Sequence, residues 1–247
     1  MNPKILTFQE EPQLSQAVHL LHKQFPPFIV YGDPVSWNLW NEVGLYKNFP
    51  SYQFALRDEE NEIIGCGHTI PLYWNGRESH LPSGYDDSLK EGFKNKKPNT
   101  LCGLAAITSF NHKGKGYSYA LIHAMKRIAE MNDFTSVILP VRPTWKQHYP
   151  IISIDHYASW ERDNGEPFDP WLRVHWRLGG VQLQTAPRSM YITGTIQQWE
   201  GWTGMSFPET GRYKVPGALS LVNINIEKNY GEYYDPNVWV VHHTHNL

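Results

Sequence analysis

The stretch TLCGLAAITSFNHKGKGYSYALIHAMKRIAEMNDFTSVILP, Thr100–Pro140, contains the elements that decide the fold. Residues 100–110 are mostly apolar and predict a buried strand, and residues 135–143 predict a second one. Between them a helix is predicted, because apolar residues recur with a helical period at Ala120, Leu121, Ala124, Ile128 and Met131. Strand, crossover helix and strand form a βαβ unit with parallel strands. The stretch therefore predicts an α/β fold.

The segments on either side alternate between helix and strand without a low-complexity linker. Asp33-Pro34 and Asp169-Pro170 each combine an N-cap carboxylate with a proline at the first helical position, which predicts a helix start. Residues 86–97 predict a polar, exposed helix. Further helices are expected within 10–25, 151–160, 170–178 and 195–202, and further strands on both sides of a turn at 58–61 and near 181–193, 213–226 and 232–241. We therefore expect one α/β (α+β) domain, 1–247, with an elaborated C-terminal half.

Composition excludes several classes of protein. The 247 residues carry 22 basic and 24 acidic side chains, for a formal charge of −2, so no broad positive surface for nucleic acid is expected. No apolar run is long enough to span a bilayer, and the start MNPKILTFQE lacks the apolar core of a signal peptide. We expect a cytoplasmic protein with no membrane partner. Cys66 and Cys102 show no metal-ligand spacing and are interpreted as small core residues, so no metal is expected.

The loop NHKGKGYS, residues 111–118, joins the first strand of the βαβ unit to its helix. Glycines allow the backbone to approach a ligand closely, and a helix N-terminus presents unpaired N–H groups to an anion. Lys113 and Lys115 add positive charge, so the loop favours a phosphate-bearing ligand. It is neither a Walker A loop nor a G-x-G-x-x-G dinucleotide fingerprint. A tight turn without a ligand is the alternative.

The same loop, Lys113-Gly114-Lys115-Gly116-Tyr117-Ser118, resembles the acyl-CoA pyrophosphate loop R/Q-x-x-G-x-G/A of the GCN5-related N-acetyltransferase (GNAT) superfamily. Lysine replaces the first Arg/Gln, and serine replaces the last small residue. The resemblance implies a coenzyme A thioester bound at this loop, on a mixed central sheet with helices on both faces. It also implies that the sheet splays after the strand at 100–110, with pantetheine along the backbone of Ile107 and Thr108. Residues 1–143 would then form the acyl-CoA-binding core, and residues 144–247 would complete the active site.

The C-terminal half resembles a narrower group, the GNAT-like proteins related to polyketide-synthase loading domains. The similar segments are VRPTWKQHYP (141–150), FDPWLRVHWRLGG (168–180), residues 186–219 and DPNVWVVHH (235–243). The chemistry of that group implies decarboxylation of malonyl-CoA or methylmalonyl-CoA in polyketide-type biosynthesis. An acyl carrier protein that receives the acyl group is a further implied partner.

Decarboxylation of a malonyl thioester leaves an enolate, so a catalyst needs hydrogen-bond donors aimed at the thioester oxygen. Our candidates for the donor pair are His175 and Thr144, which match the positions that the resemblance suggests. His175 is also the better proton donor to the carbanion, because its pKa is nearest neutrality. Trp37 is the candidate wall of the acyl pocket, and Arg188 the candidate clamp for the departing carboxylate.

Each candidate has a structural alternative. His175 lies on an apolar helix face and could be a core histidine; Thr144 could cap the segment after Pro143. Trp40 competes with Trp37, and both could belong to the core. Arg188 could form a surface ion pair, and its rival, Arg177, points away from the His175 face.

Two other functions and one other site stay open at this point. A conventional acetyltransferase would move acetyl from acetyl-CoA to an amine or a carrier thiol, with Tyr149 or His148 as the acid for the CoA thiolate. A non-catalytic CoA-thioester binding module is the third interpretation. His243 and His245 share a strand face, but no third ligand accompanies them, so a metal site there is disfavoured.

Overall fold

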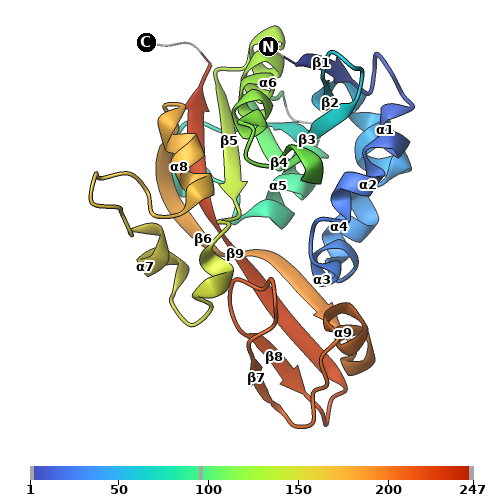
Figure 1. Ribbon diagram of the computed structural model, residues 1–247, viewed down its shortest axis with the longest axis vertical. Helices are drawn as coiled ribbons and strands as arrows, with labels where there is room; N and C mark the ends of the chain where they lie inside the picture. Colours follow the sequence, from blue (N-terminus) through green and yellow to red (C-terminus); the bar gives the residue numbers. More distant parts are fainter. Residues whose placement is uncertain (1–2, 95–96, 245–247) are drawn as a thin grey trace.

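A computed structural model describes residues 3–94 and 97–244. Their strands form a nine-stranded sheet in the order β1-β2-β3-β4-β5-β9-β8-β7, and β6 pairs with β9 (Figure 1). The strands are β1 (Lys4–Thr7), β2 (Gln53–Arg57), β3 (Ile63–Leu72), β4 (Thr100–Thr108), β5 (Ser136–Val141), β6 (Val181–Gly194), β7 (Gly211–Tyr213), β8 (Val222–Asn225) and β9 (Tyr230–His243). Only β4 and β5 pair in parallel in this part of the chain, so the sheet is mixed, as predicted.

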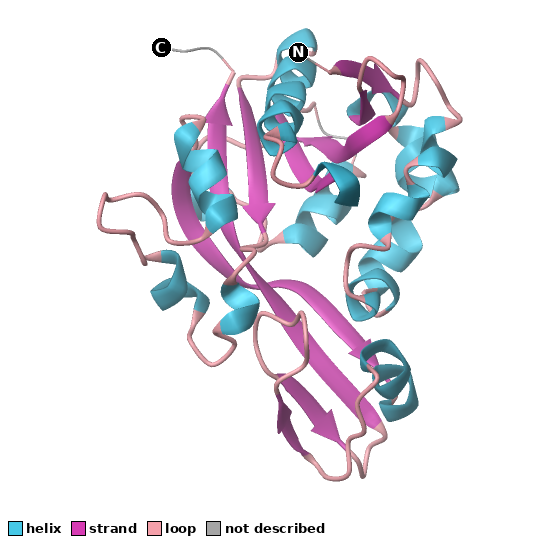
Figure 2. Cartoon of the chain, in the orientation of Figure 1, coloured by secondary structure: helices cyan, strands magenta, loops and turns pink. Residues whose placement is uncertain are grey.

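Helices cover both faces of the sheet (Figure 2). They are α1 (Leu14–Ala17), α2 (His19–His22), α3 (Pro27–Tyr31), α4 (Pro34–Leu39), α5 (Tyr85–Gly92), α6 (Tyr117–Met131), α7 (Ile154–Ala158), α8 (Pro170–Arg177) and α9 (Ile196–Thr203). Single helical turns at Glu42–Tyr46, Pro50–Tyr52, Glu78–His80, Phe110–His112 and Lys146–His148 complete the set among the described residues.

Alternation along the strands separates the two faces. Leu101 and Val137 pack with α6, α7 and α8 on one side of the sheet. Cys102 and Ile138, the next residues along β4 and β5, pack with α3 and α5 on the other side. The crossover helix α6 spans 15 residues and buries the predicted stripe except at its ends, where Met131 is 75% exposed. The predicted βαβ unit is therefore confirmed, because hydrophobic burial follows the sequence periods that predicted it.

Both Asp-Pro helix starts are confirmed. Asp33 accepts a hydrogen bond from the Val35 backbone N–H, and Asp169 accepts from those of Trp171 and Leu172. Each carboxylate satisfies N–H groups that the first helical turn leaves without a partner.

Strands β6 and β9 continue beyond the body of the sheet into a lobe that carries β7, β8 and α9 (Figure 1). An ion pair with a fully buried carboxylate anchors this lobe to the end of β5. The Nε atom of Arg142 lies 3.1 and 3.0 Å from the two carboxylate oxygens of Asp235, and a second nitrogen donates to the Gly217 carbonyl. Tyr233 also donates a hydrogen bond to the Asp235 carboxylate, so the negative charge of Asp235 has both an ionic partner and a hydroxyl donor.

Two sequence expectations are corrected. The helix expected to be exposed within 86–97 is α5, and it buries Tyr85, Asp86, Ser88 and Leu89 against β3 and β6. The sequence of this helix is mostly polar, but two of its polar residues, Asp86 and Ser88, can be buried because each forms a hydrogen bond. The strand expected near 213–226 is two short strands, β7 and β8, separated by a turn region. No helix in the described ranges combines the length and the apolarity needed to cross a bilayer.

Candidate active site

The glycine loop leads from β4 into the N-terminus of α6. Gly114 and Gly116 have φ values of 79° and 82°, and Gly116 is the N-cap residue of α6. These left-handed conformations favour glycine, because a Cβ atom clashes with the neighbouring carbonyl there. Lys113 and Lys115 are exposed on the same loop. The loop therefore presents free backbone N–H groups, the positive end of a helix dipole and two ammonium groups at one place.

The parallel strands β4 and β5 separate before β4 reaches this loop. Their pairing consists of Thr100↔Ser136, Leu101↔Val137 and Cys102↔Ile138 and then ends, although β4 continues to Thr108. On its other edge β4 stays paired with β3 up to Thr108. Within the part of the chain that the structure describes, the second half of β4 thus offers one edge without a strand partner, which is the splay that the sequence resemblance implied. Ile107 and Thr108 lie on this half.

His175 does have the buried environment that the helix pattern predicts. The side chain is 1% exposed, its ring packs edge-on against Trp171, and its Nδ1 atom lies 2.9 Å from Nε2 of His242. Burial and the neighbouring His242 lower the pKa of His175 to about 3, so the ring is neutral near pH 7. Its Nε2 atom has no hydrogen-bond partner among residues 3–94 and 97–244. A role for this ring as a donor to a thioester stays a prediction.

Among the described residues, no hydrogen bond, ion pair or ring contact joins any of the four predicted catalytic residues to another. Thr144 is exposed, and its carbonyl accepts from the Gln147 side chain. Arg188 is exposed on an irregular stretch of β6, with its guanidinium carbon 4.1 Å from the centre of the Tyr234 ring. The rival Arg177 forms a bidentate ion pair with Glu166.

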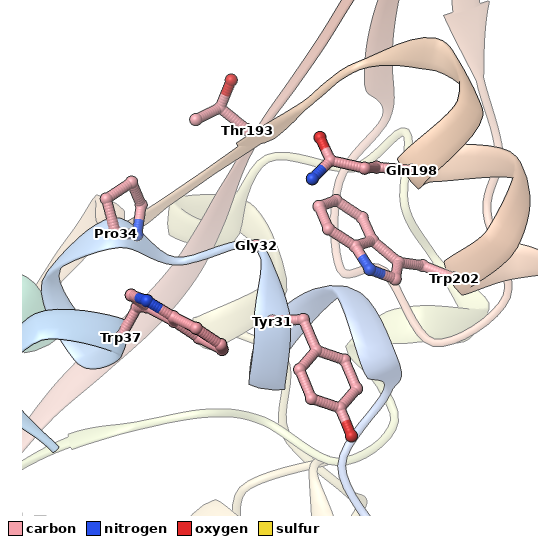
Figure 3. A pocket seen from close by; sticks show the side chains of 7 residues that line it. All are labelled: Tyr31, Gly32, Pro34, Trp37, Thr193, Gln198 and Trp202. Carbon is pink, nitrogen blue, oxygen red and sulfur yellow. The ribbon is translucent and has the colours of Figure 1, made fainter. Parts of the chain in front are cut away.

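Trp37 is 66% exposed and lines an open hollow of about 350 Å³ between α4, the end of β6 and α9 (Figure 3). The other lining residues are Tyr31, Gly32, Pro34, Thr193, Gln198 and Trp202. The sticks in Figure 3 show the rings of Trp37, Tyr31 and Trp202 around this hollow. Trp40, the competing residue, lies instead in a buried aromatic group.

That aromatic group surrounds two histidines that sequence reasoning did not select. His22 and His68 approach each other with 2.8 Å between their Nε2 atoms, and the Trp40 ring lies 4.8 Å from the His68 ring. Tyr46 stacks on His68 and accepts a hydrogen bond from the Trp40 indole. Burial lowers the pKa of His22 to about 4 and that of His68 well below its ordinary value. Both rings are neutral near pH 7.

A second unexpected pair, Asp33 and Asp86, follows along the same face. Trp40 stacks on Tyr85, whose hydroxyl lies 3.1 Å from the Ser36 hydroxyl, and Ser36 donates to Asp33. Asp33 and Asp86 interact electrostatically, and burial, together with the charge of Asp33, raises the pKa of Asp86 to about 8. Two neighbouring buried carboxyl groups cannot both ionise at low cost, so this pair retains a proton near pH 7.

The remaining candidates have structural partners. Tyr149 packs among Tyr157, Trp160 and Phe168, whereas His148 is exposed nearby. Cys66 and Cys102 are fully buried, and burial raises the pKa of both thiols, that of Cys102 to about 12. His243 is exposed at the end of β9, and His245 lies outside the described residues.

Comparison with known proteins relates this geometry to enzymes. No protein-family model matches the chain. It is 31% identical over 257 aligned positions to the arginine N-acetyltransferase avaD of Aspergillus versicolor, covering 92% of this chain and 88% of that protein. Among solved structures, the GphF GNAT-like decarboxylase in complex with isobutyryl-CoA is similar with a TM-score of 0.55 and 13% identity, over 98% of this chain and all of that one.

The loading GNATL domain of CurA from Lyngbya majuscula is a weaker match, with a TM-score of 0.48 and 15% identity over 80% of this chain and 78% of that one. The fold likeness agrees with the splayed parallel pair and the glycine loop, and the curated relative covers almost the whole chain. This chain belongs to the GCN5-related N-acetyltransferase superfamily and is an acyl-CoA-dependent acyltransferase.

Proposed function

We propose that this protein transfers an acetyl group from acetyl-CoA to an amino group of arginine or of a closely related amine. The observation that carries the proposal is the 31% identity to an arginine N-acetyltransferase over 92% of the chain. This favours the conventional acetyltransferase that the sequence left as an alternative. Decarboxylation of malonyl-CoA or methylmalonyl-CoA, with or without transfer to an acyl carrier protein, has support from fold likeness alone.

Acetyl-CoA is proposed to bind along the second half of β4, with its diphosphate at the residues predicted for it. These are Lys113, Gly114, Lys115, Gly116, Tyr117 and Ser118 for the diphosphate, and Ile107 and Thr108 for the pantetheine. The free N–H groups at the start of α6 suit a diphosphate, and the edge of β4 that lacks a partner suits the amides of the pantetheine arm. No metal is needed for either contact.

The acceptor atom follows from acid–base chemistry. An amine attacks the thioester carbonyl only as its neutral form; the N–C bond forms, the C–S bond breaks, and the ammonium proton is lost as the CoA thiolate gains one. A guanidinium keeps its proton, because its pKa exceeds about 12, whereas an α-amino group has a pKa near ~8. We therefore propose that acetylation takes place on the α-amino group of arginine. Tyr149 and His148 stay the proposed sources of the thiolate's proton.

The direct test combines purified protein with acetyl-CoA and L-arginine, and measures free CoA thiol together with the mass of the product. Nα-acetylarginine is the expected product. Parallel reactions contain agmatine, Nα-blocked arginine, lysine, or malonyl-CoA without any acceptor. Acetylation of Nα-blocked arginine would show that the acceptor is the guanidino group and not the α-amino group. Release of acetyl-CoA from malonyl-CoA, with no amide formed from arginine, would replace the proposal by decarboxylation.

A further inference from the structure

Three metal-binding side chains meet under helix α2. Cys66 and His68 are two residues apart on β3 and therefore point to the same face of the sheet. His22, the last residue of α2, lies against that face. The Sγ atom of Cys66 and one nitrogen each of His22 and His68 all lie within 4.8 Å of one another. We propose that these three residues form a binding site for a zinc ion, with one coordination position left open.

The donor set suits this ion. Zinc in proteins is held by cysteine sulfur and histidine nitrogen, and sites with three protein ligands keep a fourth position for water or another ligand. Tetrahedral bonds of about 2.0 Å to nitrogen and 2.3 Å to sulfur place the donors roughly 3.3 to 3.6 Å apart. The two Nε2 atoms are 2.8 Å apart and need to separate only slightly to reach this spacing. The Sγ atom of Cys66 lies within 4.8 Å of one nitrogen of each histidine.

The His68 ring is already oriented for metal binding. Its Nδ1 atom lies 3.2 Å from Oε1 of Gln53. The Gln53 amide nitrogen donates to the carbonyls of Phe49 and Thr69, which assigns Oε1 to the side facing His68. Nδ1 of His68 is therefore the protonated nitrogen, and the Nε2 lone pair points at the cluster. A hydrogen bond from the second ring nitrogen to an oxygen is the usual outer partner of a metal-bound histidine.

Cys66 packs in an apolar cluster with Phe8 and Ile107, and its thiol is free to bind an ion there. The His22–His68 contact is satisfied as a hydrogen bond when His22 carries its proton on Nε2, but the Cys66 thiol makes no hydrogen bond among the described residues. The rings of Phe8, Tyr46 and Trp40 enclose His68, so a bound ion is shielded from water on that side. His22 is only partly buried and gives a path for entry.

The proposed zinc site uses other residues than the proposed acetyl-CoA site along β4, but it lies close to that site. His68 pairs with Ala105, and Cys66 pairs with Ile107, both on the half of β4 that has no β5 partner. The sequence expectation of no metal rested on spacing along the chain, and it missed the set because His22 comes from a different segment. The proposal does not depend on acetyl transfer, and its test needs neither acetyl-CoA nor arginine.

The test uses the 247-residue chain without an affinity tag, stripped with a chelator, and follows Zn²⁺ binding by calorimetry. We expect one tight equivalent, and with Co²⁺ a thiolate-to-metal charge-transfer band in the near ultraviolet. Cys66→Ser and His22→Gln should weaken Zn²⁺ binding at least about 100-fold, more than the loss of an outer partner such as Gln53. The matched controls are Cys102→Ser, the other buried thiol, and His80→Gln, an exposed histidine; both should bind as the parent does.

Circular dichroism of the metal-free variants shows whether each is folded before it is titrated. The Co²⁺ spectrum needs no variant, so it reports on the site even where a substitution unfolds the chain. Absence of a tight equivalent, an absorption spectrum without a thiolate band, or equal binding by Cys66→Ser and Cys102→Ser would each overturn the proposal.

Discussion

Nδ1 of His175 on α8 lies 2.9 Å from Nε2 of His242 on β9, and both rings are buried. Burial lowers the pKa of His175 to about 3 and that of His242 to about 4. In the unfolded chain both rings take up a proton near pH 6.5. The folded state binds fewer protons than the unfolded state between these values, so stability rises with pH across that window and is lost as the pH falls below 6.5.

We therefore expect the free energy of unfolding to decrease between pH 7 and pH 5 by on the order of 2 kcal/mol for each of these rings. His242→Asn should lower stability at pH 7 and show a shallower decrease. His243→Asn, an exposed neighbour on the same strand, should keep the parent slope. Urea denaturation at several pH values measures this; identical slopes for the two variants would contradict it.

The catalytic role predicted for His175 can be separated from this structural one. If the ring acts on the thioester, His175→Gln lowers kcat at least tenfold at pH 7.5 under conditions where the variant is folded. His242→Asn, which removes its partner but leaves the ring, then retains much more of kcat. Equal and small losses for both variants would leave His175 as a core residue only.

The Asp33–Asp86 pair is expected to give stability the opposite pH dependence. The pKa of Asp86 is raised to about 8, so its proton is held in the folded state and released in the unfolded state above about 4. The stabilisation of the folded state that comes from holding this proton is fully present below pH 4 and is lost as the pH rises through 8. Asp86→Asn is uncharged at all pH values and its amide oxygen can still accept from the Tyr191 N–H, so we expect it to be more stable than the parent at pH 9 by on the order of 2 kcal/mol.

Asp87→Asn is the matched control for that variant, because Asp87 is the next residue of α5 but is partly exposed and bonded to Ser83 and Lys90. Its pKa is lowered, chiefly by the hydrogen bond from Ser83. Thermal unfolding at pH 5 and pH 9 compares the two. A pH 9 advantage of Asp87→Asn equal to that of Asp86→Asn would show that the effect is one of net charge.

The Arg142–Asp235 ion pair is expected to contribute more than any surface pair. The Asp235 side chain is fully buried and also accepts from Tyr233, so Asp235→Asn leaves the Arg142 guanidinium, whose side chain is 25% exposed, without its counter-charge. We expect a loss of about 3–5 kcal/mol in unfolding free energy. Loss of the exposed Lys90–Asp87 pair should cost about 0–1 kcal/mol. Chemical denaturation of Asp235→Asn and Asp87→Asn measures both, and similar losses would contradict the assignment.

The glycine loop provides the prediction for coenzyme binding. A Cβ atom at Gly116 has free space but demands a strained φ of 82° and alters the N-terminus of α6. Gly116→Ala should raise KM for acetyl-CoA about tenfold, with little change in kcat at saturation. Gly165→Ala carries the same kind of strain at φ 77° in a turn outside the glycine loop and should leave KM unchanged. An unchanged KM in Gly116→Ala would argue against the loop as the diphosphate site.

Much of this molecule follows from local sequence signals. The helix starts at Asp33-Pro34 and Asp169-Pro170, the stripe of α6 and the glycines before it were all predictable, because caps, periodicity and left-handed turns depend on residues within a few positions. The βαβ order then determined the parallel pair, and the resemblance of the loop to the acyl-CoA loop of the superfamily implied the GNAT fold. The buried face of α5 was not predictable, because Asp86 accepts from the Tyr191 N–H and the Tyr85 N–H donates to Ser189, and both partners belong to β6, a distant segment.

The side-chain clusters were decided by the tertiary structure alone. His22 and His68 are 46 positions apart in the chain, and His175 and His242 are 67 apart. The sequence showed that His175 would be buried, but it could not name the ring that faces it, nor bring Cys66 and His22 together. Periodicity tells which way a side chain points, whereas the packing of sheet and helices determines what it meets there.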